Sequence, residues 1–236
     1  MPWKVLTRAG HTVHFATEHG GSAPHADPLL LSGVIMGQLG AEPEPKAFYQ
    51  EMLADPLFDA PVSWSDVQPS QFDGLLLPGG HAPGMRQYLS SDELRHTVAN
   101  FWSLNRPVAA ICHGVLVLAR THDNETGRSL LFGRRTTCLP KYMERTAYFA
   151  TSWRLGRYYR TYPAYVEDEV RVALARREDF VRGPWVLSQR GSDVNDRPAM
   201  FVRDANYLSA RWPGDAYLFA KGFVKLLEER AAPGAA

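Results

Sequence analysis

The chain has little cysteine, with two residues, Cys112 and Cys138, among 236. Two thiols are too few for a small fold held by several disulfides, and they form no cysteine–histidine cluster with the spacing of a zinc site. The first residues also lack the charged-then-apolar pattern of a signal peptide. We therefore expect a cytoplasmic protein with both thiols reduced and no bound metal.

The chain also lacks long apolar runs and an excess of charge of either sign. No run approaches the roughly 20 residues that span a membrane, and 26 basic residues stand against 25 acidic ones. Balanced charge gives no electrostatic basis for binding nucleic acid, so we expect neither a membrane nor a nucleic-acid partner. The length favours a single domain over residues 1–230, followed by a disordered tail at 231–236.

The most informative segment is residues 109–114, where a short apolar run ends at Cys112 and a helix-forming run follows. This pattern predicts a strand, a sharp turn and a helix, with the thiol at the turn. Ala110 and Gly114 are small, as the tight turn of a nucleophile elbow requires two positions before and after the nucleophile. The N-terminus of a helix favours a thiolate, and His113 is the adjacent candidate base. A buried structural cysteine is the alternative interpretation.

Strand and helix patterns alternate along the rest of the chain. Residues 72–78 form an apolar run closed by two glycines, typical of a strand buried on both faces. We expect further strands at 11–17, 107–111, 134–139, 201–203 and 207–210, and helices at 91–104 and 215–229. This alternation predicts an α/β fold, with a parallel sheet sandwiched by helices. Ligands bind outside the carboxyl ends of such strands, where residues 78–84 and Cys112 fall.

Three segments do not belong to this simple pattern. Residues 18–67 are rich in proline, glycine and alanine around one predicted helix at 47–53. Residues 142–165 are dense in aromatics and arginine, which predicts a small helical insertion serving as a cap or subunit contact rather than a nucleic-acid surface. Three consecutive acids at 167–169 are interpreted as a solvated helix start, not a metal site, because neighbouring helical positions point different ways.

The chain opens with a helical pattern at residues 2–8, ahead of its first predicted strand. In a β-α-β unit, a helix that leads into a buried strand itself follows a strand. We therefore expect that the first strand of the sheet precedes Met1, in the full protein or in its close relatives.

With these segments in hand, the chain resembles the ThiJ/PfpI superfamily, which shares the class I glutamine amidotransferase-like fold. It is most similar to the glyoxalase III-like and heat-shock-chaperone-like branch. The resemblance rests on residues 73–81, 109–114, 166–170 and 202–210. It implies a flavodoxin-like fold, in agreement with the alternation above, and a homodimer.

The resemblance also implies roles for the residues at matching positions. Cys112 would be the nucleophile and His113 its partner. The backbone N–H groups of Gly80 and His113 would form an oxyanion site, which needs donors where negative charge develops. Gly79 lets the backbone approach closely. His81, in the loop that faces the elbow, has two interpretations: it touches the substrate, or it only shapes the loop.

Two acids complete the implied site. An acid about thirty residues after the cysteine orients the histidine in this branch, and Glu144 is the best candidate. The family also has a glutamate ahead of its first helix, at a position that would precede Pro2. The catalytic competence that the resemblance implies is therefore conditional on a chain extended upstream.

The implied reaction is a glutathione-independent glyoxalase reaction, of the D-lactate dehydratase type, on a small α-oxoaldehyde such as methylglyoxal. Thiolate addition, proton transfer through an enediol and hydrolysis of a thioester need no metal or organic cofactor. The alternatives are a cysteine peptidase or amidase, a holdase chaperone that uses the aromatic insertion, and a thiol redox sensor. A glutamine amidotransferase is excluded, because its histidine lies well downstream of the cysteine and the last histidine here is His122.

Overall fold

The computed structural model describes residues 1–34, 40–160, 162–186 and 188–231, which divide into two units at residue 67. Because each unit is described by itself, the single domain over 1–230 stays a prediction. Ala231 is the last residue of a helix, and the remainder of the predicted tail, 232–236, lies outside the described residues. Within the described part of the chain, no helix is long and apolar enough to cross a membrane.

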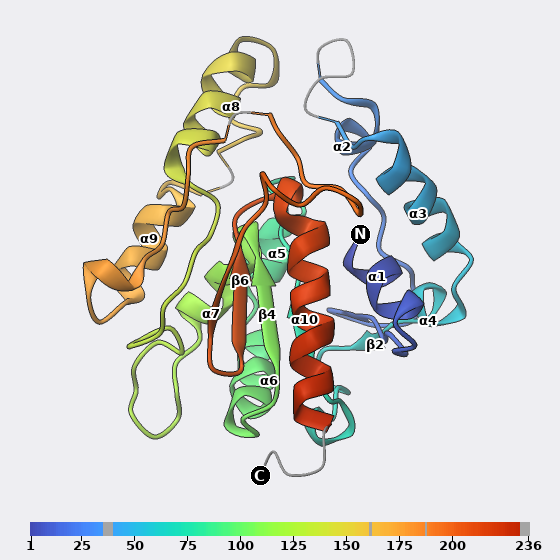
Figure 1. Ribbon diagram of the computed structural model, residues 1–236, viewed down its shortest axis with the longest axis vertical. Helices are drawn as coiled ribbons and strands as arrows, with labels where there is room; N and C mark the ends of the chain where they lie inside the picture. Colours follow the sequence, from blue (N-terminus) through green and yellow to red (C-terminus); the bar gives the residue numbers. More distant parts are fainter. Residues whose placement is uncertain (35–39, 161, 187, 232–236) are drawn as a thin grey trace. The chain divides into compact units, whose positions relative to one another are not determined.

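The larger unit is built on a four-stranded sheet with the order β3-β4-β6-β5 (Figure 1). Three strands run parallel, and β5 pairs antiparallel with β6 as a hairpin. The strands are β3 (Leu75–Leu77), β4 (Val108–Ile111), β5 (Phe201–Asp204) and β6 (Tyr207–Ala210). The predicted hairpin around residues 204–206 is confirmed, with Ala205 in the left-handed region at φ +51°.

Helices cover both faces of this sheet, as the α/β prediction requires. The helix α10 (Ala216–Ala231) lies on one face, and α6 (Asp92–Ser103) and α7 (Val115–Arg120) lie on the other (Figure 1). The first five residues of α7 are all buried, as expected of a helix that is apolar all round. The other helices of this unit are α5 (Met85–Ser90), α8 (Lys141–Leu155) and α9 (Val166–Ala173).

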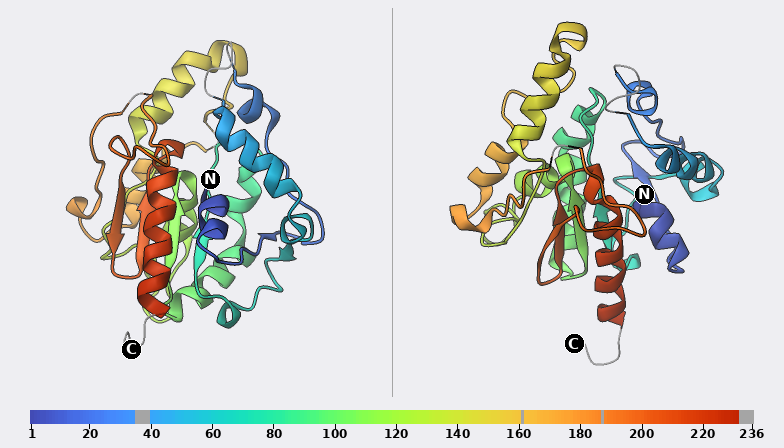
Figure 2. Two further views of the ribbon diagram at one scale, coloured as in Figure 1. Left: turned by 45° about the vertical axis from the view of Figure 1, so that its right-hand side comes forward. Right: turned by 45° about the horizontal axis from the view of Figure 1, so that its top comes forward.

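The predicted insertion forms α8 and a returning segment that leads into α9. Both views in Figure 2 show α8 extending beyond the end of the sheet. The predicted strand at 134–139 is wrong. Thr136 instead makes a single bridge to Phe180. The Thr136 N–H donates to the Asp179 carbonyl, and the Thr136 carbonyl accepts from the Val181 N–H. The neighbouring Thr137 N–H bonds to the Ser209 hydroxyl rather than to a strand backbone.

The smaller unit, residues 1–67, has its own two-stranded parallel sheet. Its elements are α1 (Pro2–Arg8), β1 (Ala16–Thr17), α2 (Pro28–Ser32), α3 (Pro43–Leu53), α4 (Pro56–Asp59) and β2 (Val62–Ser63). The strand predicted at 11–17 is therefore reduced to its last two residues. The helix predicted at 47–53 is confirmed and begins earlier, at Pro43, where proline suits the first turn. The strand expected ahead of Met1 stays a prediction.

Candidate active site

Cys112 lies at the carboxyl end of β4, on the sharp turn that the sequence predicts. All four residues of β4 are buried, and a one-turn helix, Cys112–Gly114, joins the strand directly to α7. Cys112 has a φ of +59°, a left-handed conformation that is unfavourable for a residue with a side chain. Strain of this kind persists only where the surroundings impose it, and it sets the thiol at the point where strand becomes helix.

Two glycines allow the turn after β3 to lie against this elbow. A Cβ on Gly114 would lie 2.4 Å from the Leu77 carbonyl oxygen, and one on Gly79 would lie 2.5 Å from both the Cys112 Cβ and the Ile111 oxygen. Both positions are closed to any side chain. The same Cβ on Gly79 would lie 3.0 Å from the His113 nitrogen, so the bare turn borders the proposed oxyanion N–H.

The side chains of Cys112 and His113 form a close pair. The sulfur lies 3.4 Å from Nδ1 of the imidazole, and the two residues are 6% and 1% exposed. In the tautomer protonated at Nε2, Nδ1 accepts the thiol proton. The elbow thus brings together a nucleophile and the base that can deprotonate it.

Burial, rather than the helix terminus, governs the charge of this pair. Burial raises the pKa of the Cys112 thiol to about 12, while the His113 backbone N–H acts in the opposite direction. Burial also lowers the pKa of the His113 imidazole to about 3, and the nearby His81 and Arg120 add to this shift. The expectation of a favoured thiolate is therefore wrong for this structure, because the loss of hydration outweighs the dipole of a six-residue helix.

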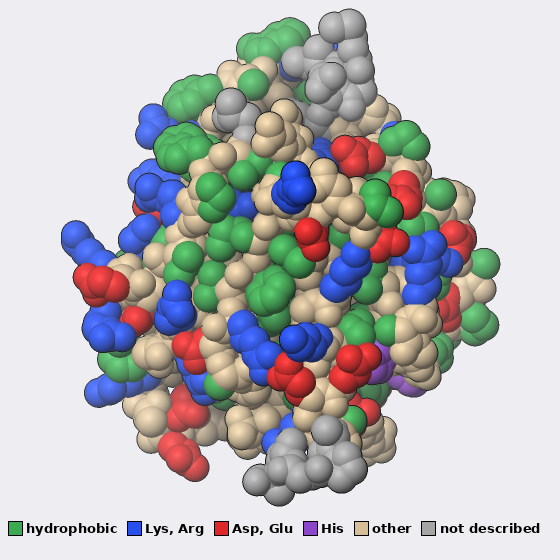
Figure 3. Space-filling view, in the orientation of Figure 1, with side chains coloured by type: hydrophobic (Ala, Val, Ile, Leu, Met, Phe, Trp, Pro, Cys, Tyr) green, Lys and Arg blue, Asp and Glu red, His purple; other side chains and the backbone are tan. Residues whose placement is uncertain are grey.

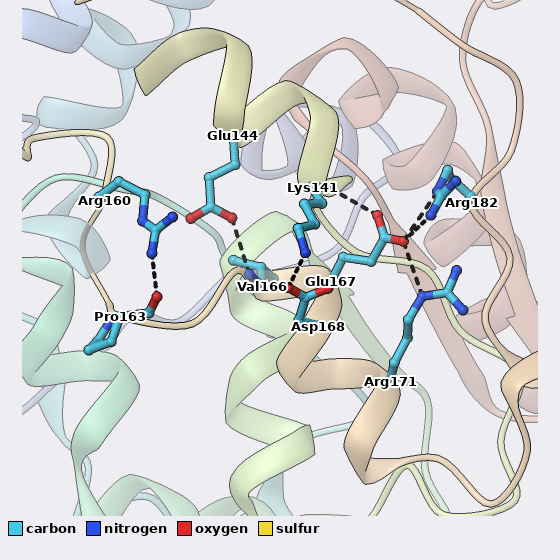
Figure 4. Close-up of polar contacts among 9 residues, drawn as sticks. All are labelled: Lys141, Glu144, Arg160, Pro163, Val166, Glu167, Asp168, Arg171 and Arg182. Atoms are coloured by element: carbon cyan, nitrogen blue, oxygen red, sulfur yellow. Dashed lines mark hydrogen bonds and ion pairs between the residues drawn. The ribbon is translucent and has the colours of Figure 1, made fainter. Parts of the chain in front are cut away.

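Glu144 lies in the first turn of α8, buried, with its carboxylate turned toward the start of α9 (Figure 4). The Val166 N–H donates to its Oε2 at 3.1 Å, so the carboxylate stabilises the N-terminus of α9. The His113 ring contacts Cys112 and His81. Among the described residues, no hydrogen bond joins Glu144 to that ring. Its role in orienting His113 stays a prediction. Burial raises the Glu144 pKa to about 7.

A second buried carboxylate, Glu167, links α8 and α9 beside this site (Figure 4). Its oxygens accept from the backbone N–H of Lys141 and from the guanidinium groups of Arg171 and Arg182. Glu167 is 2% exposed, so the interpretation of residues 167–169 as a solvated helix start is wrong at this position. Three donors hold the carboxylate charged. No cluster able to bind a metal occurs among the residues that the structure describes.

The aromatic insertion reaches the site, which the sequence did not indicate. The ring of His81 lies 4.3 Å from that of Tyr159, 5.7 Å from that of Tyr158 and 6.3 Å from that of His113, between centroids. The density of aromatics at 142–165 signalled a packed segment. It could not show which of its rings meet a loop almost eighty residues earlier in the chain.

These features define a class of protein: an α/β fold with a thiol on a strained turn between a buried parallel strand and a helix. A family model described as ThiJ/PfpI family-like matches residues 1–184, and the chain belongs to this family. The resemblance inferred from four sequence motifs is thereby confirmed.

Several relatives are similar over most of their length. An uncharacterised protein of Schizosaccharomyces pombe is 28% identical, covering 96% of this chain and 77% of that protein. Deglycase PfpI of Pyrococcus furiosus is 25% identical, covering 96% of this chain and 89% of that protein. The crystal structure of glyoxalase III from Candida albicans, at 19% identity and a TM-score of 0.67, covers 95% of this chain and 84% of its own and supports the fold.

Proposed function

We propose that the protein is a cysteine-dependent enzyme acting on small α-oxoaldehydes, with Cys112 as nucleophile and His113 as its base. The observation that carries the proposal is the sulfur of Cys112, held on a left-handed turn 3.4 Å from Nδ1 of His113. Deglycases among the relatives, and glyoxalase III among proteins of the same fold, support chemistry on a carbonyl carbon.

In the proposed reaction, the Cys112 sulfur adds to the aldehyde carbon while the thiol proton passes to Nδ1 of His113. The carbonyl oxygen becomes an oxyanion that accepts from the N–H groups of His113 and Gly80, and it then takes the proton from Nδ1. The resulting hemithioacetal has its carbon-bound proton next to the imidazole. His113 takes this proton from C1 and returns it to C2 through an enediol, while the hydroxyl proton on O1 passes to O2. The product is a thioester, which water hydrolyses to a 2-hydroxy acid and the free Cys112 thiol.

Because the pair is neutral at rest, thiol deprotonation and carbon–sulfur bond formation belong to one step. A free thiolate with its pKa near 12 would be scarce at neutral pH. Burial leaves His113 neutral but weakly basic, so Nδ1 takes the proton only as the carbon–sulfur bond forms. The proposed reaction uses no metal and no organic cofactor, as the sequence analysis expects.

Hydrolysis of a carbonyl adduct is the second candidate, favoured by the name deglycase that several relatives bear. Here Cys112 would add to an aldehyde-derived adduct on another molecule and release that molecule. Both candidates use the same elbow, and they differ in whether the free aldehyde is a substrate. We also propose a cytoplasmic location and a homodimer. Sedimentation equilibrium tests the homodimer, which should have twice the chain mass of 26.4 kDa.

The test is D-lactate production from methylglyoxal by this chain and by a form extended upstream of Met1, because the resemblance implies an upstream glutamate. Cys112→Ala should abolish it, whereas Cys138→Ala, at the other buried free cysteine, should retain it. Release of a preformed methylglyoxal–thiol adduct without turnover of free methylglyoxal would favour the deglycase. Activity that survives Cys112→Ala would contradict both. Suppressed client aggregation by an inactive Cys112→Ala protein would favour the chaperone alternative.

A further inference from the structure

The segment that returns from α8 lies across the turn that faces the elbow. The rings of Tyr158 and Tyr159 lie 5.1 Å apart, and both contact the ring of His81. The Tyr159 ring is tilted 33° to that of His81, whereas the Tyr158 ring meets it edge-on at 83°. The segment therefore packs on the loop that carries Gly79 and Gly80.

A third tyrosine fixes the position of this segment. The hydroxyl of Tyr162 donates to the Arg86 carbonyl on α5 at 3.1 Å, and the Arg120 guanidinium on α7 lies 4.5 Å from its ring. Arg120 is itself held by Glu169 through two hydrogen bonds. Tyr162, three residues after Tyr159, is thus tied to α5 and α7, and through Arg120 to α9.

His81 links the tyrosine pair to the reactive pair. Its ring lies 6.3 Å from that of His113, whose Nδ1 is 3.4 Å from the Cys112 sulfur. Cys112 and Tyr159 are only 6% and 5% exposed, so a compound bonded to the sulfur enters a region that is already packed with rings. Aromatic side chains have few rotamers and pack at near-crystalline density, and they yield little space to a bulky group. Size should therefore separate substrates here more sharply than polarity does.

We propose that Tyr158 and Tyr159, packed on His81, are specificity determinants that restrict Cys112 to carbonyl compounds with a small substituent, such as a hydrogen or a methyl group. The inference rests on the proposed function, and it adds the size class of the substrate. Removing one ring should raise kcat/KM for an aryl oxoaldehyde relative to that for methylglyoxal by about tenfold, the range that pocket size commonly controls.

The experiment uses Tyr159→Ala and Tyr158→Ala in the full chain, with phenylglyoxal and methylglyoxal as the substrate pair. Tyr159→Phe keeps the ring and should keep the wild-type ratio. Phe149→Ala is the matched control, because Phe149 belongs to the same insertion but is 63% exposed. Tyr159→Leu supplies an apolar replacement without the ring if the alanine variant does not fold.

A second readout is independent of turnover. In a Cys138→Ala background, Cys112 is the one remaining thiol, and its alkylation by iodoacetamide and by N-phenylmaleimide is followed by intact mass. Loss of the Tyr159 ring should speed the bulky reagent about tenfold more than the small one. Size selectivity that matches wild type in the folded variants overturns the proposal. If the wild type turns over neither aldehyde but the alkylation selectivity changes in the variants, the size restriction by the tyrosines is supported and the proposed function fails.

Discussion

Two opposing effects act on the thiol of Cys112, and the structure shows which is larger. A helix N-terminus and the His113 N–H stabilise a thiolate, whereas full burial destabilises it. Burial prevails, and it also keeps His113 neutral, so the resting pair carries no charge. The elbow therefore contributes position rather than a preformed anion, and reactivity depends on proton transfer to Nδ1 as the carbon–sulfur bond forms.

This neutral pair predicts a distinctive pH dependence of alkylation. With a thiol pKa of about 12, the thiolate fraction rises tenfold for each pH unit below that value. In a His113→Ala, Cys138→Ala protein, which has no base beside the thiol, the rate of iodoacetamide addition to Cys112 should rise about tenfold per unit between pH 7 and 9. In Cys138→Ala protein, where neutral His113 takes the proton as the bond forms, the rate should change much less over this range. Equal slopes in the two proteins would contradict the role of His113 as the base.

Gly114 predicts a steric effect on stability. A Cβ at this position would lie within 2.5 Å of two carbonyl oxygens, of Leu77 and Pro78, and backbone atoms cannot rotate away. Gly114→Ala should lower the free energy of unfolding by about 3 kcal/mol, the scale of an overpacked core. Gly84→Ala is the control, since nothing lies within 4 Å there and its φ is −62°. Urea unfolding measures both, and equal effects would contradict the steric argument.

At the scale of elements, local patterns predicted the core of the fold and long-range contacts decided the rest. The elbow, the helix α6 with its Ser91 cap and the final helix follow from apolar runs and cap residues close in sequence. The segment 134–139 has the composition of a strand, but its backbone groups pair elsewhere. The same holds for the site, where Cys112 and His113 are adjacent in sequence whereas the cover of Tyr158 and Tyr159 depends on tertiary packing.

The insertion also exposes aromatic side chains, the kind of surface that the alternative of a holdase chaperone requires. Phe149 and Trp153 are 63% and 74% exposed on α8. In Figure 3, hydrophobic and basic side chains lie side by side over the region of this helix. Tyr159, in the same insertion, is instead buried and packs on the ring of His81. The insertion thus has exposed aromatic side chains on α8 and buried ones that pack beside the candidate site.

Glu167 and its three donors, Lys141, Arg171 and Arg182, are expected to hold α8 against α9. Glu167→Ala would leave Arg171 and Arg182 without their shared carboxylate and remove the acceptor of the Lys141 N–H. We expect a loss of about 2 kcal/mol in the free energy of unfolding, because charge-assisted hydrogen bonds are lost while the remaining arginines, 30% and 45% exposed, can reach water. Asp168→Ala removes a half-exposed pair with Lys141 and should cost less than about 1 kcal/mol. Similar losses in thermal or urea unfolding would contradict the ranking.

At the scale of the whole molecule, the two buried glutamates act on pH stability in opposite directions. The arginines hold the pKa of Glu167 below its usual range, so its contribution is present above pH 4.5 and is lost as the pH falls. Glu144 has a raised pKa, so the folded state binds its proton more tightly than the unfolded chain does. Its contribution is fully present below pH 4.5 and is lost as the pH rises through about 7.

Glu144→Gln should therefore flatten the alkaline side of the stability curve. Glutamine keeps an oxygen that accepts the Val166 N–H, and it stays neutral at every pH. Near pH 4.5 the variant and the wild type should unfold at similar urea concentrations. By pH 8 the variant should be the more stable, by at most about 3 kcal/mol, because ionising the buried acid penalises the wild type alone.

Arg160 and Lys141 favour the charged form of Glu144, and Asp168 opposes it, so the measured gain in stability reports the balance of these charges. Parallel curves for the two proteins between pH 5 and 8 would show that Glu144 is ionised throughout and that burial does not control this carboxyl.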